Sequence, residues 1–345
     1  MELLGKRVLR RIPWGCLALA AVFGAWLARP GLVAEAAREG LGRCGAVVVP
    51  TLFPFFVLSN LFVRRGYHRY VAALVRPLMG PLFGLSPAAA GPLVLGAVGG
   101  YPVGAATVFQ LYDRGQLDAR EASRALAFCN NAGPGFILGV AGLGLLGSVR
   151  LGVVLYAVHL LTAAAVGLLL RRPAAAGRPA LPPAGEAEPF PASLVGAVRD
   201  AAAAIVQVCA FLVFFSVVLA WLQLLPLWAR LPDAVGPLAA GAVELSTGVA
   251  RLAGLPAGTA MTACAFLLGW GGLCVHCQVL SLRGSRAIGL RPYFCGKLLQ
   301  GLLSAAAVQL LAGRWLLPLL ALAAAGLAGM AARKLPSGNR AVGDV

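Results

Sequence analysis

The sequence contains few charged residues. Asp, Glu, Lys and Arg make up 12% of its 345 residues, about half the share of roughly 25% that is usual in soluble domains. Acidic side chains are the scarcer kind, since 12 Asp and Glu stand against 29 Lys and Arg, for a net charge of +17. So few charges cannot cover a water-exposed surface. With 60% hydrophobic residues, the composition excludes a soluble globular protein and predicts a membrane protein.

Sets of residues that could carry catalysis are also missing. The eight cysteines lack the spacing of a disulfide framework. Cys274, His276 and Cys277 resemble part of a metal site, but no second ligand pair follows for closed zinc coordination. The sequence has no Ser/His/Asp set, no paired carboxylates in one segment and no phosphate-binding loop with its lysine. We therefore expect no enzyme activity, no metal and no cofactor.

The apolar runs are close to the 20 or so residues that a helix needs to cross a bilayer. The first run follows a basic N-terminus but has no small-residue cleavage site after it, so we interpret it as an anchor helix. We predict eight crossing helices, near 12–30, 44–63, 125–147, 151–170, 202–225, 257–281, 293–313 and 315–332.

Two further apolar stretches, 84–110 and 234–252, are interrupted by glycine and polar residues. If both are re-entrant helical hairpins, 22 of the basic residues lie on the cytoplasmic side and seven on the other, as the positive-inside rule requires. Lys297 is counted among the cytoplasmic bases. Both termini are then cytoplasmic. The basic clusters thus belong to membrane topology, with lipid as a partner and no nucleic acid.

The order of elements predicts an inverted duplication. Each half has a crossing helix, an interrupted hairpin, a broken crossing helix and a closing helix, and the second half starts on the opposite side of the membrane. Many secondary transporters share this plan. The predicted parts are an anchor at 1–40, a first repeat at 41–170, a Pro- and Ala-rich cytoplasmic linker at 171–191, a second repeat at 192–313, and a C-terminal helix and tail at 314–345.

The hairpin of the first half contains Gly100, Tyr101, Pro102 and Gly104. A helix that restarts after Pro102 would direct free N–H groups and its positive dipole end into the protein, which suits an anionic oxygen. The alternative is a packing face formed by Gly100 and Gly104. The sequence alone supports both interpretations equally.

The next crossing helix of the first half is broken at Asn130, Asn131 and Gly133. Side-chain amides can donate to carboxylates or offer lone pairs to a cation without carrying a charge. An Asn that caps a helix with Pro134 near its first turn is the structural alternative. The two interpretations are compatible, and capping would need only one of the two amides.

In the second half, Glu244 is the only acidic residue that we place at membrane depth, and Ser246 and Thr247 follow it. An ionisable group there is costly, so we favour a functional role, in coupling transport to a proton or cation. The alternative is that Glu244 lies at an aqueous opening and pairs with Arg251, two helical turns away.

The densest polar group in any predicted crossing lies around Gly272, His276 and Gln278. We expect His276 and Gln278 to face a cavity, although an intramembrane histidine is sometimes only a packing residue. His159, in contrast, has no polar neighbour in the sequence, and we interpret it as structural.

These breaks occur together in an order that resembles the YlbJ family of sporulation integral membrane proteins, which have a nucleoside-recognition or Gate membrane domain. The resemblance covers about 41–313. It is carried by the segments 51–60, 100–105, 130–134, 244–248 and 271–278.

The resemblance implies transport of dipicolinate, a pyridine dicarboxylate, during spore formation, in the cell membrane or the outer forespore membrane. Two alternatives stay open: a carrier of nucleosides or other small solutes, and a membrane scaffold that transports nothing. The sequence leaves the oligomeric state of the protein open, and an oligomer is possible. Polar breaks within lipid argue against the scaffold, which has no need of them. The expected substrate-binding residues are Gly100, Tyr101, Pro102, Gly104, Asn130, Asn131, Gly133, Ser246, Thr247, Gly272, His276 and Gln278, with Glu244 for coupling.

Overall fold

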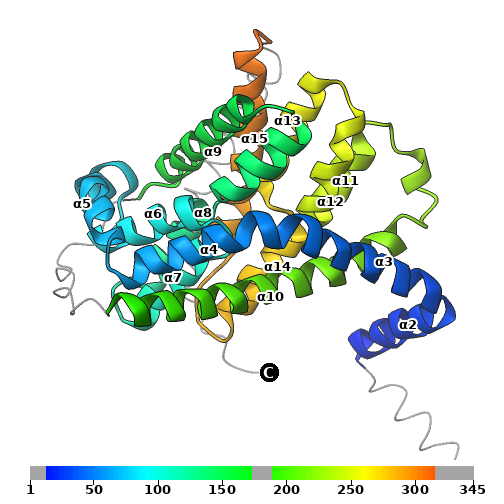
Figure 1. Cartoon of the computed structure of the whole chain (residues 1–345), viewed down its shortest axis with the longest axis horizontal. Helices are drawn as coiled ribbons and strands as arrows, with labels where there is room; N and C mark the ends of the chain where they lie inside the picture. Colours follow the sequence, from blue (N-terminus) through cyan, green and yellow to red (C-terminus); the bar gives the residue numbers. More distant parts are fainter. Residues whose placement is uncertain (1–12, 173–188, 315–345) are drawn as a thin grey trace, which may run out of the picture.

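The computed structural model describes residues 13–172 and 189–314. Within these ranges the chain is all-helical and contains no strand, which confirms the predicted fold class of an all-α polytopic membrane protein (Figure 1). The predicted helix at 315–332 and most of the linker lie outside the described residues. Five helices in the described part are long and apolar enough to cross a membrane: Pro30–Phe62, Val149–Leu169, Phe190–Leu222, Ala257–Arg283 and Arg291–Leu311.

The N-terminal region contains one long helix that begins earlier than predicted. After α2 (Trp14–Ala28), α3 (Pro30–Arg43) continues through the π-helical turn η1 (Cys44–Val48) into α4 (Val49–Arg64). The predicted crossing at 44–63 is therefore the second part of a longer helix. α2 has 15 residues and no buried side chain, so the described part of the predicted anchor is shorter than the usual crossing length.

A helix also occupies the stretch 64–76, which the sequence predicted only as a basic cytoplasmic segment. α5 (His68–Leu78) is followed by η2 (Met79–Phe83) and η3 (Pro87–Ala89). Tyr70 and Leu74 on α5 are about three-quarters exposed. Exposed apolar side chains beside arginines are typical of an amphipathic helix at a membrane surface.

Both interrupted stretches form two short helices that pack against each other. In the first half these are α6 (Ala90–Gly99) and α7 (Val103–Asp113), and in the second half α11 (Val235–Val243) and α12 (Leu245–Arg251). Gly96 and Gly104 approach each other within the first pair, and Gly241 and Gly248 do so within the second. The hairpins predicted at 84–110 and 234–252 are therefore present. Their re-entrant course in a membrane stays a prediction.

The crossings that follow the hairpins are broken in both halves. The first consists of α8 (Ala119–Cys129) and the π-helical η4 (Gly135–Leu145), before α9 (Val149–Leu169). The second half starts with α10 (Phe190–Leu222), and its broken crossing consists of α13 (Ala257–Trp270) and α14 (Gly272–Arg283), before α15 (Arg291–Leu311). Two 3-10 turns, η5 (Trp228–Arg230) and η6 (Leu252–Gly254), lie in the connections.

Corresponding elements of the two halves make corresponding contacts. α4 packs against α10, and α9 against α15, while α4 contacts η4 as α10 contacts α14 (Figure 1). Glycines bring the closing helices close to their neighbours, through Gly142 and Gly152 in the first half and Gly269 and Gly301 in the second. This packing is what an inverted repeat would produce, and the inversion itself stays a prediction.

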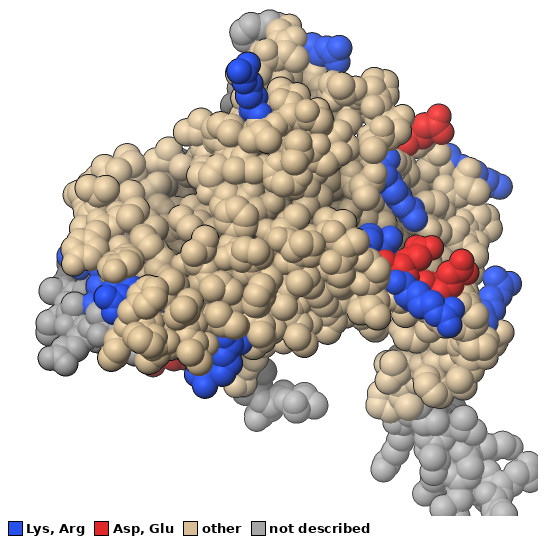
Figure 2. Space-filling model, viewed as in Figure 1, with Lys and Arg blue, Asp and Glu red and all other residues tan. Residues whose placement is uncertain are grey.

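Polar contacts join segments that the sequence places on the same side of the membrane. Asp113 and Arg286, from two predicted cytoplasmic segments, form an ion pair of 2.7 Å. Arg64 and Asp200 form another of 2.7 Å between two further cytoplasmic segments. In Figure 2 charged side chains gather at the edges of the visible face and are absent from its middle. A band without charges is the expected surface toward lipid.

Candidate functional site

A cavity of about 70 Å³ lies where the broken elements of both halves meet. α4 and α10 form its apolar sides, through residues such as Phe55, Phe56 and Leu212. Its polar groups are few and come from the breaks. The predicted site residues that line it are Gly100, Tyr101, Gly133, Glu244, Ser246 and Gln278. Two stretches separated by more than a hundred residues therefore face one space.

The first half contributes a close contact between its two breaks. Gly100 has a φ of +75°, and a Cβ on it would lie only 2.7 Å from the backbone nitrogen of Gly133. Both conditions require glycine. Tyr101 follows, and its hydroxyl donates to the Leu268 carbonyl at 2.6 Å, which ties the hairpin to α13. The turn of the α6–α7 hairpin thus forms one wall of the cavity.

Backbone groups freed by these breaks are mostly satisfied by nearby side chains. The amide N–H of Ala105, in the first turn of α7, donates to Asn130 Oδ1 at 3.4 Å. Gly104 lies against the Cys129 carbonyl, with no room for a Cβ. The packing interpretation therefore holds for Gly104, and the N-terminus of α7 is not an open anion site. Pro102 ends the turn and does not line the cavity.

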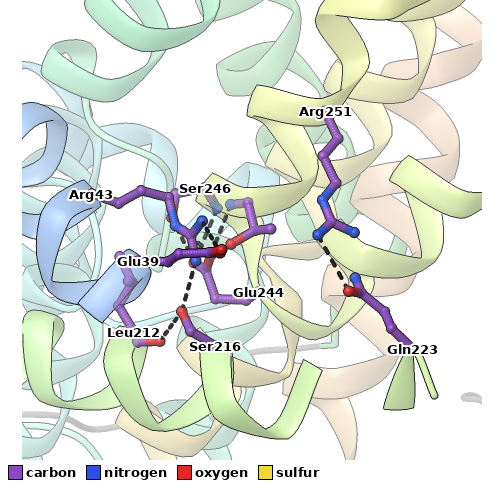
Figure 3. Close-up of polar contacts among 9 residues, drawn as sticks. Glu39, Arg43, Leu212, Ser216, Gln223, Glu244, Ser246 and Arg251 are labelled. Carbon is purple, nitrogen blue, oxygen red and sulfur yellow. Dashed lines mark hydrogen bonds and ion pairs between the residues drawn. The ribbon is translucent and has the colours of Figure 1, made fainter. Parts of the chain in front are cut away.

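The second half contributes a carboxylate at the N-terminus of α12. Glu244 is 3% exposed. Its oxygens accept from the Ser246 N–H at 3.0 Å and the Thr247 N–H at 2.7 Å. They also accept from the Ser246 hydroxyl at 2.8 Å (Figure 3) and from the Thr247 hydroxyl at 2.6 Å. Glu244 is therefore the N-cap of α12, and its side chain binds the backbone and hydroxyl groups of Ser246 and Thr247.

The alternative pairing of Glu244 with Arg251 is wrong. Arg251 instead contacts the side chain of Gln223, which directly follows α10 (Figure 3). Ser246 and Thr247, predicted as substrate ligands, both bind Glu244. The polar breaks of the second half are thus organised around one acidic side chain.

Asn130 and Asn131 lie behind the cavity wall rather than on it. Asn131 donates to the Phe128 carbonyl at 2.8 Å and accepts from Gln300 Nε2 at 3.0 Å. His159 has no polar neighbour in the sequence, but in space its Nε2 accepts the Ala132 N–H at 3.0 Å. This contact fits the structural role predicted for it, because it satisfies broken backbone in the adjacent crossing.

Of the predicted site residues in α14, Gln278 lines the cavity, whereas Gly272 and His276 do not. Gly272 has a φ of +81° and lies close to the backbone of the α11–α12 turn, which places the broken helix against that hairpin. His276 bonds through Nδ1 to the Tyr293 hydroxyl at 2.9 Å and contacts Trp270 edge to face. It does not line the cavity, whereas Gln278 does, and Gln278 Oε1 has no partner there.

The sequence did not predict that Lys297 belongs to this region. Lys297, counted above as a cytoplasmic base, has no exposed surface and lies in the core. Its ammonium donates to the Asn130 carbonyl at 2.8 Å and to Gln300 Oε1 at 2.6 Å. The sequence gives a weak signal at most, because a lysine in the second turn of a crossing helix is typical of the membrane interface.

A second cavity of about 240 Å³ lies between α3, α10 and α12. It is polar, and Arg43 in its wall donates to Ser216 at 3.0 Å and approaches Glu39 at 3.7 Å (Figure 3). Thr247 lines this cavity, whereas Glu244 and Ser246 line the first one. The Glu244 cap therefore lies between the two spaces.

Comparison with known proteins agrees with this architecture. Residues 46–166 match a family model described as Gate, nucleoside recognition. The sporulation integral membrane protein YlbJ of Bacillus subtilis (strain 168) is 29% identical over 321 residues, which cover 83% of this chain and 79% of that protein. No solved structure matches. With its apolar crossing helices, the chain is a multi-pass integral membrane protein that is similar to YlbJ over most of its length and contains a segment that matches the Gate family model.

Proposed function

We propose that this protein transports a small anionic solute during sporulation, and that the solute is dipicolinate. The observation that carries the proposal is the cavity at the meeting point of both sets of broken elements. Broken helices are tolerated at membrane depth where they line a cavity or are buried in protein. A midplane site between two repeats is the general plan of secondary transporters. The name of the Bacillus relative supports the link with sporulation.

The cavity offers chemistry suited to a flat aromatic anion. Phe55 and Phe56 supply apolar faces, while Gln278 and the backbone at Gly100 supply polar groups. A volume of about 70 Å³ has room for several waters, so binding of a pyridine dicarboxylate requires the walls to move apart. Alternating access provides that motion, since one repeat rocks against the other around the site.

Glu244 suits a role in coupling. Its negative charge opposes a dianion in the same cavity, and protonation removes this repulsion. Protonation also adds a donor where two N–H and two O–H groups already donate, so at least one of the two hydroxyls must turn to accept from Glu244. A proton on Glu244 would thereby loosen the element between the two cavities. The second cavity then serves as the route of access on the side opposite the cytoplasm.

The remaining features of the proposal follow from topology. We place both termini in the cytoplasm and the protein in the outer forespore membrane, where it acts as a carrier and not as an enzyme. A single chain provides both halves of the cavity, so an oligomer is not needed for the site.

The test uses sporulating cells that lack this protein but retain dipicolinate synthesis. The proposal predicts spores with little dipicolinate and an excess in the mother cell. Normal dipicolinate content in the spores would overturn it and would favour the scaffold. Spores of the parent strain provide the reference.

A nucleoside carrier is the second candidate, because the matching family model is described by nucleoside recognition. Liposomes containing the purified full-length protein distinguish the two. Uptake of radiolabelled dipicolinate that is unaffected by excess uridine or adenosine supports the anion carrier. Uptake of nucleosides, blocked poorly by dipicolinate, supports the alternative.

A further inference from the structure

The buried amino group of Lys297 is an ionisable group that the proposed function does not yet use. It lies within α15 and is fully buried. Two protein acceptors contact it, the Asn130 carbonyl at 2.8 Å and Gln300 Oε1 at 2.6 Å. The ring of Tyr101 lies nearby, with its centroid 5.4 Å from Nζ. An ammonium has three N–H donors, and the third thus faces an aromatic ring rather than a fixed acceptor.

Lys297 has no acidic partner. The ion pairs found between residues 13–172 and 189–314 join Glu39 to Arg43, Arg64 to Asp200 and Asp113 to Arg286, and none of them includes Lys297. The titratable groups that face it from packed elements are Cys129, His159 and His276, together with Tyr101. None of these is a carboxylate. A buried charge without a counter-charge is costly, and such residues in membrane helices are rare and usually functional.

The position of this charge relates it to the cavity. Tyr101 lines the cavity and also lies against the ammonium. Asn130, whose carbonyl binds Lys297, lies three residues before Gly133, which also lines the cavity. The ammonium therefore lies directly behind the cavity wall. Because Lys297 is buried away from bulk water, the field of a charge at this depth reaches the cavity with less screening than at the surface.

We propose that Lys297 is the fixed positive charge that an anionic substrate neutralises, and that it makes the site selective for dianions over monoanions and neutral solutes. The inference rests on the proposed function and names the charge class of the substrate. Lys297 acts through the wall formed by Tyr101, so it is a specificity-determining residue and does not itself contact the solute in the structure. The anionic substrate supplies the negative charge that no side chain of the protein provides beside Lys297.

The experiment compares three ligands on the purified full-length protein: pyridine-2,6-dicarboxylate, the monoanion pyridine-2-carboxylate and the neutral pyridine-2,6-dicarboxamide. In the wild type the dianion binds most tightly. In Lys297→Met we expect the dianion affinity to fall roughly tenfold or more, because one opposite charge at short range is lost. The affinity of the dicarboxamide stays the same. A purely structural role would lower all three affinities together.

The matched control is Gln309→Met, which replaces another buried polar residue of α15 but changes no charge. It should leave the order of the three affinities intact. The thermal stability of the ligand-free protein provides a second measurement. Because Lys297→Met removes an uncompensated buried charge, the variant should melt at the same temperature as the wild type or higher.

Lys297→Gln keeps a donor for the Asn130 carbonyl and gives an independent result if the Met variant does not fold. A dianion preference unchanged in a folded neutral variant overturns the inference and leaves the carrier proposal standing. Loss of folding in both variants assigns Lys297 a structural role and also overturns it. A wild type that binds none of the three ligands overturns the proposed function and this inference with it.

Discussion

Glu244 combines two properties that are rarely found in one side chain of a membrane protein. It is buried, and it holds the first turn of α12 through both backbone and hydroxyl donors of Ser246 and Thr247. A capping role alone would be met by a serine or an asparagine, which carry no charge. The choice of an ionisable cap beside a cavity is what supports its role in coupling.

Glu244→Gln should abolish the pH dependence of dipicolinate uptake, because the amide cannot take up a proton. It should also reduce stability by about 1–3 kcal/mol, since its NH₂ group faces donors that the carboxylate accepts. Uptake into proteoliposomes across a pH series measures the first effect, and thermal melting measures the second. Asp233→Asn, an exposed acidic residue before α11, is the control. A pH profile unchanged in Glu244→Gln would refute the coupling role.

The hydroxyl and the ring of Tyr101 have separate roles. Its hydroxyl holds α13 through the Leu268 carbonyl, and its ring lines the cavity. Tyr101→Phe should therefore cost about 1 kcal/mol of stability while preserving dianion preference, because the ring beside Lys297 remains. Melting curves and the three-ligand comparison check the two parts. A loss of dianion preference in Tyr101→Phe would show that the hydroxyl, and not the charge behind the ring, selects the ligand.

The hairpin α6–α7 depends on glycines that allow backbone to approach backbone. Gly96 and Gly104 both lie against the Cys129 carbonyl at the end of α8. Gly104→Ala should destabilise the protein by about 1–3 kcal/mol, through overpacking that no side-chain movement can relieve. Gly91→Ala on α6 meets no atom within 4 Å and should be neutral or slightly stabilising. Equal melting temperatures for the two variants would contradict the described packing.

The breaks of these elements could be predicted from sequence, whereas their partners could not. Glycine, proline and asparagine within apolar runs mark where a helix must end, and the structure has ends at Gly99, Cys129, Val243 and Trp270. The sequence does not show which side chain satisfies each break. His159 and Gln300 serve the break in the α8–η4 crossing from α9 and α15, far away in the chain.

Lys297 and α5 illustrate the two ways in which local patterns mislead. Lys297 follows Arg291 by only six residues, so its position along the chain resembles that of an interfacial base. It is buried because the carbonyl of Asn130 lies against α15, a contact that depends on tertiary structure. The error at α5 is the opposite: its arginines indicated only a basic cytoplasmic segment, although its apolar residues repeat with helical spacing.

The topology of the whole molecule makes a prediction that is independent of the substrate. Arg114 lies between α7 and α8, in a segment predicted to be cytoplasmic, and Arg230 lies in η5, which is predicted to be on the opposite side of the membrane. The test replaces each of them with cysteine in a separate variant. The exposed Cys16 and Cys295 are replaced by serine, and the protein is expressed in the cell membrane of vegetative cells. An impermeant thiol reagent added to these intact cells should label Arg230→Cys only. Labelling of Arg114→Cys from outside would contradict the inverted arrangement.

The central claim is that the solute passes through the space where the two sets of broken elements meet, and filling that space tests it most directly. Val208 of α10 lines the cavity, whereas Val206 on the same helix is 66% exposed on its outer surface. Uptake of radiolabelled dipicolinate is measured in proteoliposomes containing Val208→Trp or Val206→Trp, with melting curves to verify folding. The account predicts loss of uptake in Val208→Trp and uptake as in the wild type in Val206→Trp. Equal uptake by the two folded variants would contradict it.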